Sequence, residues 1–272
     1  MKNIIFFFSG TGNCLAVART MAKKLGDTKV VSILALRENK VIPQHYEKIG
    51  FVYPTSYSHA PKIVMDSITG LQFQPDQKIF LIATAGGGCM YALSDVKKQL
   101  QPNTKNAVQE FFIPLPGNHI VGFSAYPKFL QNLLFKRAKK TIEKIVNQIQ
   151  HDIPTKPRKT PPNPEAFLAM QARLNKRLMH VKDIFSTQSE YFTTDACDHC
   201  GICEKLCPVQ NIKVTSDSVT FGDNCQQCMA CIQWCPKRAI FHPNVDLKRK
   251  RYHHPDITLN DMLQAVKIPK DI

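Results

Sequence analysis

Eight of the ten cysteines form two copies of one pattern near the end of the chain. In each copy, two residues separate the first three cysteines from one another, three more precede the fourth, and a proline comes next. The copies are Cys197, Cys200, Cys203 and Cys207 before Pro208, and Cys225, Cys228, Cys231 and Cys235 before Pro236. Soft thiolates at this spacing are the ligands of 4Fe-4S clusters. The pattern therefore predicts two such clusters and a role in electron transfer.

A tight loop with a cysteine at every third position can supply three ligands to one cluster while its fourth cysteine reaches the other. The expected ligand sets are Cys197, Cys200, Cys203 and Cys235 for one cluster, and Cys225, Cys228, Cys231 and Cys207 for the other. Zinc and disulfides are the alternatives. Zinc sites usually pair two separated Cys-x-x-Cys hooks, and disulfides belong to oxidising compartments. A triple hook that ends in Cys-Pro and occurs twice favours clusters, and hence a reducing cytoplasm.

A second candidate site is the run Phe8-Ser9-Gly10-Thr11-Gly12-Asn13-Cys14, between a predicted strand and a predicted helix. Small residues let backbone N–H groups and hydroxyls surround a phosphate, and the helix N-terminus adds partial positive charge. The expected side-chain donors are Ser9, Thr11 and Asn13, while Gly10 and Gly12 permit the tight turn. The chain has no Gly-x-x-x-x-Gly-Lys loop, so hydrolysis of nucleoside triphosphates is not indicated.

The elements around this loop predict a parallel sheet covered by helices. Short apolar runs alternate with helical patterns through the first half of the chain, which is typical of α/β folds. The expected strands are residues 2–8, 29–34, 49–53, 77–84 and 107–113. Helices are expected at residues 15–25 and 61–68, around Leu93, Val96 and Leu100, and at residues 130–149, where the apolar face includes Leu130, Leu133 and Leu134. Five strands with crossover helices predict a doubly wound sheet.

The glycine-containing loop resembles the phosphate loop of flavodoxins, which reads Ser/Thr-x-Thr-Gly-x-Thr. Four residues match this motif, and Cys14 stands in place of its last hydroxyl; the matching residues are Ser9, Thr11, Gly12 and Asn13. The resemblance implies that residues 1–150 form a flavodoxin-like domain that binds FMN.

The same resemblance implies that two loops at the carboxyl ends of the third and fourth strands hold the flavin ring. These loops are Pro54, Thr55, Ser56 and Tyr57, and Thr84, Ala85, Gly86, Gly87 and Gly88. Tyr57 is the candidate for stacking on the ring, with an ordinary surface aromatic as the alternative. Asn118, in Pro116-Gly117-Asn118, is a further candidate for facing the flavin, although its context favours a turn.

The cysteine region resembles bacterial-type ferredoxins with two clusters over residues 195–241. Joined together, the halves are similar to the microbial family of flavodoxin and ferredoxin fusions, often labelled EFR-type ferrodoxins, across essentially the whole chain. The resemblance implies an α+β ferredoxin-like domain at residues 188–245. A basic linker with five prolines between residues 153 and 164, followed by a bridging helix, is expected within residues 151–187. Residues 246–272 form a tail similar to that of the family, and its residues suggest no chemistry of their own.

The charge is strongly positive and unevenly placed, with a formal net value of +15. Residues 128–182 carry 13 Lys or Arg and three acidic residues, whereas residues 190–240 carry four basic and six acidic residues. A basic surface attracts acidic proteins, nucleic acid and anionic lipid through the same Coulomb interaction. The charge therefore fits redox partner proteins with acidic docking surfaces, and equally a solvated face.

A flavin accepts one or two electrons and each cluster accepts one, so their fusion predicts a cytoplasmic electron-transfer flavoprotein that converts between pair and single transfers. One alternative is an enzyme that reduces a small substrate at FMN, although no dedicated acid, base or nucleophile pair is evident. Another is a basic nucleic-acid-binding protein with structural clusters, but no aromatic-rich basic motif supports it. No apolar stretch reaches the roughly 20 residues of a membrane span.

Overall fold

The computed structural model describes residues 2–89, 91–122, 124–156, 190–243, 245 and 248–268. Contacts within the chain define two compact units. The first contains Met1–Gly117, Tyr126–Thr160 and Lys267–Ile272, and the second contains Asn118–Ala125 and Pro161–Val266. Most of the predicted proline-rich linker, and the whole of the helix expected after Asn163, lie outside the described residues.

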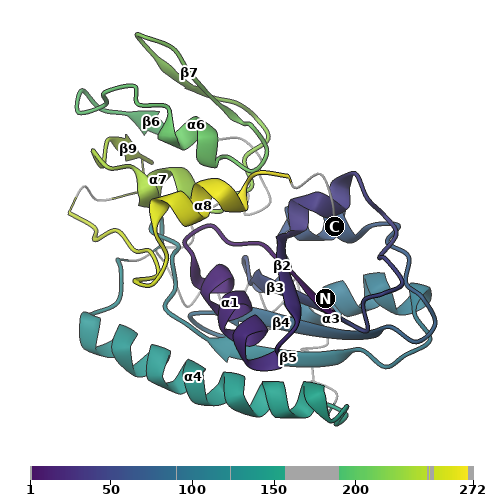
Figure 1. Ribbon diagram of the computed structural model, residues 1–272. Coiled ribbons are helices and arrows are strands. Elements are labelled where there is room, and N and C mark those ends of the chain that lie inside the picture. Colours follow the sequence, from purple (N-terminus) through teal and green to yellow (C-terminus); the bar gives the residue numbers. More distant parts are fainter. Residues whose placement is uncertain are drawn as a thin grey trace. The chain divides into compact units, whose positions relative to one another are not determined.

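The first unit is built on a five-stranded sheet with the order β2-β1-β3-β4-β5 (Figure 1). Its strands are β1 (Asn3–Phe7), β2 (Thr28–Ser32), β3 (Lys48–Pro54), β4 (Lys78–Ala85) and β5 (Gln109–Pro114). All neighbouring strands are parallel. The strands are almost continuously apolar because both faces of a parallel sheet are covered, and Ile4, Ile5 and Phe51 are fully buried. The predicted doubly wound sheet is confirmed, and each strand boundary lies within about two residues of its expected position.

Helices wind around this sheet, as expected for parallel strands joined by crossovers. The helices are α1 (Asn13–Leu25), α2 (Lys62–Ile68), α3 (Ala92–Leu100) and α4 (Lys128–Gln150). α1 packs against α4, and α2 packs against α3. Two short 3-10 helices, Ile33–Arg37 and Gln101–Asn103, complete the connections. The strand order reverses around β1, which places the loop after β1 at the switch point where α/β sheets bind ligands.

The apolar face of α4 is only partly covered. Ala138, Ile142 and Ile149 are buried, but Leu133, which lies on the predicted apolar face, is 41% exposed and the neighbouring Phe129 is 75% exposed. Helical periodicity shows which face of a helix is apolar, but it does not show how much of the helix length a neighbouring layer covers.

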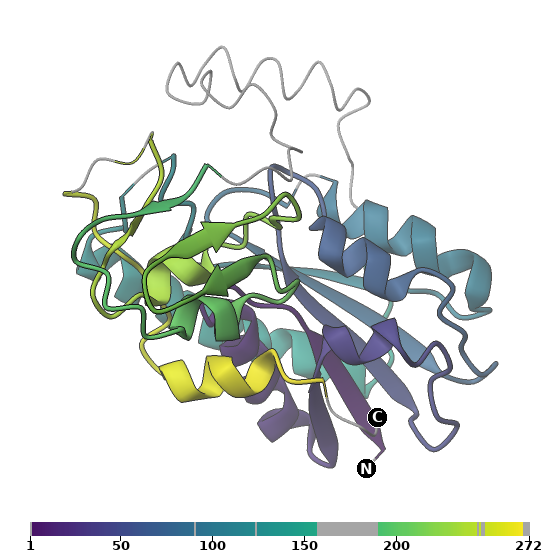
Figure 2. The same ribbon diagram turned by 90° about the horizontal axis from the view of Figure 1, so that it is seen from above.

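The second unit combines short helices with small antiparallel sheets, drawn in green to yellow in Figures 1 and 2. β6 (Phe192–Thr193) pairs with β9 (Ile240–Phe241), and β7 (Ile212–Val214) pairs with β8 (Val219–Phe221). Its helices are α6 (Ile202–Leu206), α7 (Ala230–Trp234) and α8 (Leu259–Ala265). Thr258 and Asp261 form a capping box that begins α8. This arrangement confirms the predicted α+β class for the cysteine region.

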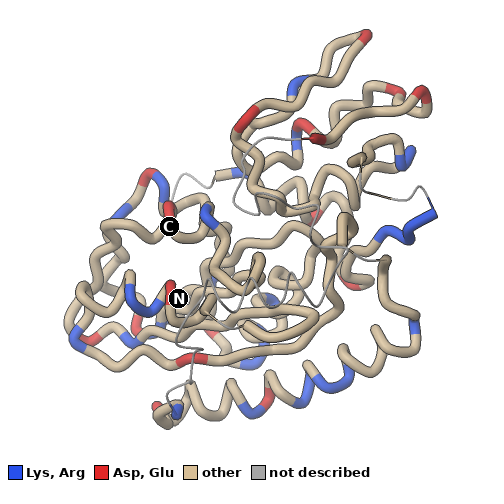
Figure 3. The backbone as a smooth tube through the Cα atoms, turned by 180° about the vertical axis from the view of Figure 1, so that it is seen from behind, with Lys and Arg blue, Asp and Glu red and all other residues tan. Residues whose placement is uncertain are grey.

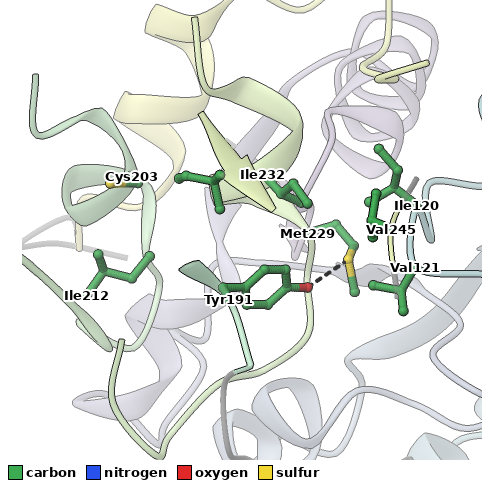
Figure 4. Packing of buried hydrophobic residues seen from close by; sticks show 9 residues of the cluster. Ile120, Val121, Tyr191, Cys203, Ile212, Met229, Ile232 and Val245 are labelled. Carbon is green, nitrogen blue, oxygen red and sulfur yellow. Dashed lines mark hydrogen bonds between the residues drawn. The ribbon is translucent and has the colours of Figure 1, made fainter. Parts of the chain in front are cut away.

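A segment that follows β5 belongs to the core of the second unit. Ile120 is 1% exposed and packs in one apolar cluster with Val121, Tyr191 and Met229 (Figure 4). Within this cluster the Tyr191 hydroxyl donates a hydrogen bond to the Met229 sulfur at 3.1 Å. The sequence places residues 118–125 in the first domain, whereas their contacts place them in the second unit. The sequence alone does not show that Ile120 and Val121 pack with residues much later in the chain.

In the part of the chain that the structure describes, no helix combines the length and the apolar character needed to cross a bilayer.

Candidate functional site

The two halves of the cysteine unit repeat the same backbone turns. In each half, the residue before the second cysteine, the residue after it, and the third residue after the fourth cysteine have left-handed φ angles. These residues are His199 (53°), Gly201 (73°) and Gln210 (52°), and Gln227 (48°), Met229 (65°) and Arg238 (53°). Left-handed backbone is uncommon outside glycine. Its recurrence at equivalent positions shows that the two cysteine patterns encode the same tight loop twice.

Backbone N–H groups donate hydrogen bonds to cysteine sulfurs at equivalent places in both patterns. Asn211 donates to Cys207 Sγ at 3.1 Å, and Ala239 donates to Cys235 Sγ at 3.3 Å. These two donors occupy the same place, four residues after the last cysteine of each pattern. Gln227 also donates to Cys225 Sγ at 3.3 Å. Hydrogen bonds of this kind stabilise thiolate charge and tune the potentials of iron–sulfur clusters.

The electrostatic neighbours of the cysteines fall into two groups that cross between the patterns. Burial raises the pKa of Cys203 to about 11, and the charges of Cys235 and Cys200 contribute to the rise. Burial also raises the pKa of Cys228 to about 12, with contributions from Cys225 and Cys207. Cys235 therefore lies near Cys200 and Cys203, and Cys207 lies near Cys228 and Cys231.

The donor set fits iron–sulfur cubanes. None of the ten cysteines forms a disulfide, so the eight patterned thiols are available as ligands. Among the described residues, no three His, Cys, Asp or Glu side chains converge on a single metal-ion position. A cubane does not require such convergence, because each of its four thiolates binds a different iron. Iron binding removes the protons that burial otherwise holds on these thiols.

The predicted phosphate loop joins β1 to α1 at the carboxyl edge of the sheet. Gly12 occupies the N-cap of α1 with a φ of 91°, and its N–H donates to Ser9 Oγ at 3.0 Å. Asn13 Nδ2 donates to the carbonyl of Pro116 at 2.9 Å, and Thr11 is buried. The Ser9 and Asn13 side chains therefore brace the loop. The backbone N–H groups at the start of a helix are a further place where an anion can bind.

Two of the predicted contact residues meet each other inside the first unit. Cys14 Sγ lies 3.2 Å from Thr84 Oγ1, and both side chains are buried. Burial raises the pKa of Cys14 to about 12, although its hydrogen bond with Thr84 acts in the opposite direction. The Cys14 thiol is consequently neutral at physiological pH and is buried against Thr84.

The loop after β3 contains a hydroxyl without a hydrogen-bond partner and a turn with left-handed backbone. Thr55 Oγ1 is buried and has no hydrogen-bond partner among the residues that the structure describes. An unsatisfied buried hydroxyl costs about 1–3 kcal/mol. Tyr57 (φ 45°) and Ser58 (φ 75°) form a two-residue turn closed by reciprocal 2.9 Å hydrogen bonds between Ser56 and His59. Bulky residues in left-handed backbone are strained, and such strain is concentrated at ligand-binding loops.

The loop after β4 approaches other backbone too closely for a side chain. A Cβ atom at Gly86 would lie 2.9 Å from the N atom of Gly117 and 2.6 Å from the hydroxyl of Tyr126. Gly86, Gly87 and Gly88 are all exposed at this edge of the sheet. A contact between these glycines and a flavin ring stays a prediction.

Asn118 lies in the second unit, where its carbonyl accepts a hydrogen bond from Gln233 Nε2 at 2.7 Å. A contact between Asn118 and flavin stays a prediction. Gln233 was not among the residues selected from sequence, although it stands between the predicted ligands Cys231 and Cys235. A glutamine that binds backbone atoms leaves no spacing signal that a single sequence could reveal.

Comparison with known proteins supports the assignment of the cysteine region. A family model described as a 4Fe-4S dicluster domain matches residues 189–236. No curated protein shows significant sequence similarity to the chain.

The comparison with solved structures found matches that cover part of the chain. A putative flavoprotein from Bacteroides uniformis is 16% identical, with 42% of this chain and 90% of that chain covered and a TM-score of 0.34. A flavodoxin from the domain Archaea is 17% identical, with 56% and 100% covered and a TM-score of 0.35. An azoreductase from Bacillus anthracis is 11% identical, with 54% and 100% covered and a TM-score of 0.36. These scores are too low to support an argument.

The fold assignment rests instead on the strand order 2-1-3-4-5, which is the flavodoxin-like order. The chain therefore joins a flavodoxin-like α/β region to a 4Fe-4S dicluster domain. This combination confirms the predicted resemblance to fusions of flavodoxin and ferredoxin.

Proposed function

We propose that this protein relays electrons between one FMN and two 4Fe-4S clusters, and so converts between two-electron and one-electron transfers. The observation that carries the proposal is the cysteine loop that occurs twice, with none of its eight thiols in a disulfide, in the same chain as a flavodoxin-like sheet. When bound, the flavin supplies one- or two-electron steps and each cluster supplies single-electron steps. The protein's own residues bind these groups and set their potentials.

The proposed flavin site lies at the carboxyl edge of the sheet. The backbone from Gly10 to Asn13 would hold the phosphate, and the ring would lie between the loop that contains Thr55 and Tyr57 and the exposed glycines after β4. The chain lacks the spaced Gly-x-Gly-x-x-Gly fingerprint of dinucleotide sites. FMN therefore fits this loop better than FAD, because a helix N-terminus accommodates a terminal monophosphate.

The proposed partners are redox proteins with acidic docking surfaces. Exposed basic residues follow one another along α4, as the blue positions in Figure 3 show. They are Lys128, Lys136, Arg137, Lys139, Lys140 and Lys144. Clustered charge of one sign raises the rate of encounter with a partner of opposite sign. The free cysteines support a location in the reducing cytoplasm.

Cofactor analysis of anaerobically purified protein tests this function. We expect about eight irons and about one flavin per chain, with acid extraction releasing FMN. Iron would be measured by chelation assay, and the extracted flavin would be identified by chromatography against FMN and FAD standards. Zinc in place of iron, or protein that neither contains nor binds a flavin, would contradict the proposal.

A further inference from the structure

The end of the chain binds the backbone on both sides of one predicted cluster ligand. Arg251 Nη1 donates to the carbonyl of Ile232 at 2.7 Å. Its Nη2 donates to the carbonyls of Ile240 at 2.7 Å and Arg238 at 3.3 Å. Ile232 precedes Cys235 in the chain, and the other two acceptors follow it. One guanidinium therefore connects the end of α7 to the start of β9 across the loop that carries Cys235.

Neighbouring contacts fix the position of this guanidinium. The N–H of Tyr252 donates to Gln233 Oε1 at 2.7 Å, and the ring of His253 stacks on Trp234 with centroids 4.3 Å apart. The guanidinium carbon of Arg251 also lies 5.0 Å from the centre of the Phe241 ring. Contacts of successive residues thus hold the segment of residues 251–253 against α7.

A second arginine anchors the segment that precedes Arg251. Arg249 Nη1 donates to the carbonyl of Ile120 at 2.7 Å and also to that of Val121. The N–H of Lys250 donates to Ser124 Oγ at 3.0 Å. Because residues on both sides of Arg251 are held by hydrogen bonds, the guanidinium group of Arg251 has little freedom to move.

The charge held in this position is permanent. Burial lowers the pKa of Arg251, and the thiolates of Cys235 and Cys231 act in the opposite direction. An arginine keeps its proton under all physiological conditions. The recorded acceptors of Arg251 are carbonyl oxygens, which leave its net charge in place. A fixed positive charge therefore lies beside the ligand loop.

We propose that Arg251 is a positioning residue that raises the reduction potential of the cluster ligated by Cys235. The inference rests on the proposed function, because it assumes that the clusters are redox-active. A cluster gains one negative charge when it is reduced, so a nearby fixed cation stabilises the reduced form. The cluster ligated by Cys231 shifts in the same direction by a smaller amount.

Redox titration followed by electron paramagnetic resonance tests this role in the full-length wild-type, Arg251→Gln and Lys250→Gln proteins. In Arg251→Gln we expect the ratio of reduced to oxidised cluster at a fixed potential to fall about tenfold for one couple, which corresponds to about 59 mV for one electron. That couple should be the one lost in Cys235→Ser. Lys250 is exposed, so Lys250→Gln removes the same formal charge and should leave both couples unchanged.

Unchanged potentials in Arg251→Gln protein with full iron content would overturn the inference, and equal shifts in both variants would assign the effect to overall charge. If Arg251→Gln loses iron, Arg251→Lys decides the question. Iron retained in Arg251→Lys, at the wild-type potential, would support the charge. Iron lost from this variant as well would show that the hydrogen bonds of the guanidinium group, rather than its charge, are required to hold the cluster, and would overturn the inference. A wild-type protein without a reducible cluster would refute the proposed function rather than the role of Arg251.

Discussion

Replacing Cys235 by serine is expected to remove the cluster held by Cys197, Cys200 and Cys203, although these cysteines belong to the other sequence pattern. The reason is the crossed grouping of the thiols, in which the charge of Cys235 acts on Cys200 and Cys203. We expect the iron content to fall from about eight to about four per chain, because one complete cubane remains. Alkylation of the anaerobic protein followed by mass spectrometry identifies the cluster that is lost.

In Cys235→Ser, the cysteines at 197, 200 and 203 should become labelled while those at 225, 228 and 231 stay protected. Cys207→Ser should give the opposite pattern, which makes the two variants controls for each other. Cys89 is buried in the first unit, and Cys89→Ser should leave the iron content unchanged. Labelling of Cys225, Cys228 and Cys231 in Cys235→Ser would show that each pattern ligates its own cluster.

Replacing Gly12 by aspartate is expected to abolish FMN binding. Gly12 has a φ of 91° at the N-cap of α1, where a side chain strains the backbone by roughly 1–2 kcal/mol. The added carboxylate would also lie against the phosphate. Two like charges about 4 Å apart near a protein surface repel by about 4 kcal/mol, which corresponds to a roughly thousandfold weaker Kd. Fluorescence titration of the flavin-depleted protein with FMN measures this change.

Two matched variants separate the causes of the loss. Gly12→Ala introduces the strain without the charge and should weaken FMN binding much less. Gly26 ends the same helix with a φ of 70° and has open space around it, so Gly26→Asp should leave the Kd unchanged. A thermal unfolding curve equal to that of the wild type would show that the first unit of each variant is folded. Wild-type FMN affinity in Gly12→Asp would mean that the phosphate binds elsewhere.

The sheet could be predicted from sequence because its signals are local. Strands that are buried on both faces appear as apolar runs, as around Ile4 and Phe51, and a run of this kind needs no knowledge of its neighbours. Residues 118–125 could not be placed in the same way. Ile120 and Val121 are an apolar pair without period, and their burial depends on residues about 70 or more positions away in the chain.

The cluster ligands could be predicted for a similar reason, since their spacing is itself the chemical signal. The tail could not be interpreted, because the partners of Arg251 are backbone carbonyls, which any residue provides. The phosphate loop could be predicted in part. The motif correctly located the loop at the start of α1, but the hydrogen bonds of Ser9 and Asn13 within the protein depend on the three-dimensional structure.

Rapid mixing of the reduced holoprotein with limiting oxidant, at several protein concentrations, tests the proposed relay most directly. Flavin and cluster absorbance would be recorded separately while the electrons redistribute between the centres. A relay within one molecule predicts a transfer rate that is independent of protein concentration. A rate that rises in proportion to protein concentration would contradict the relay and show that the two carriers exchange electrons only by collision.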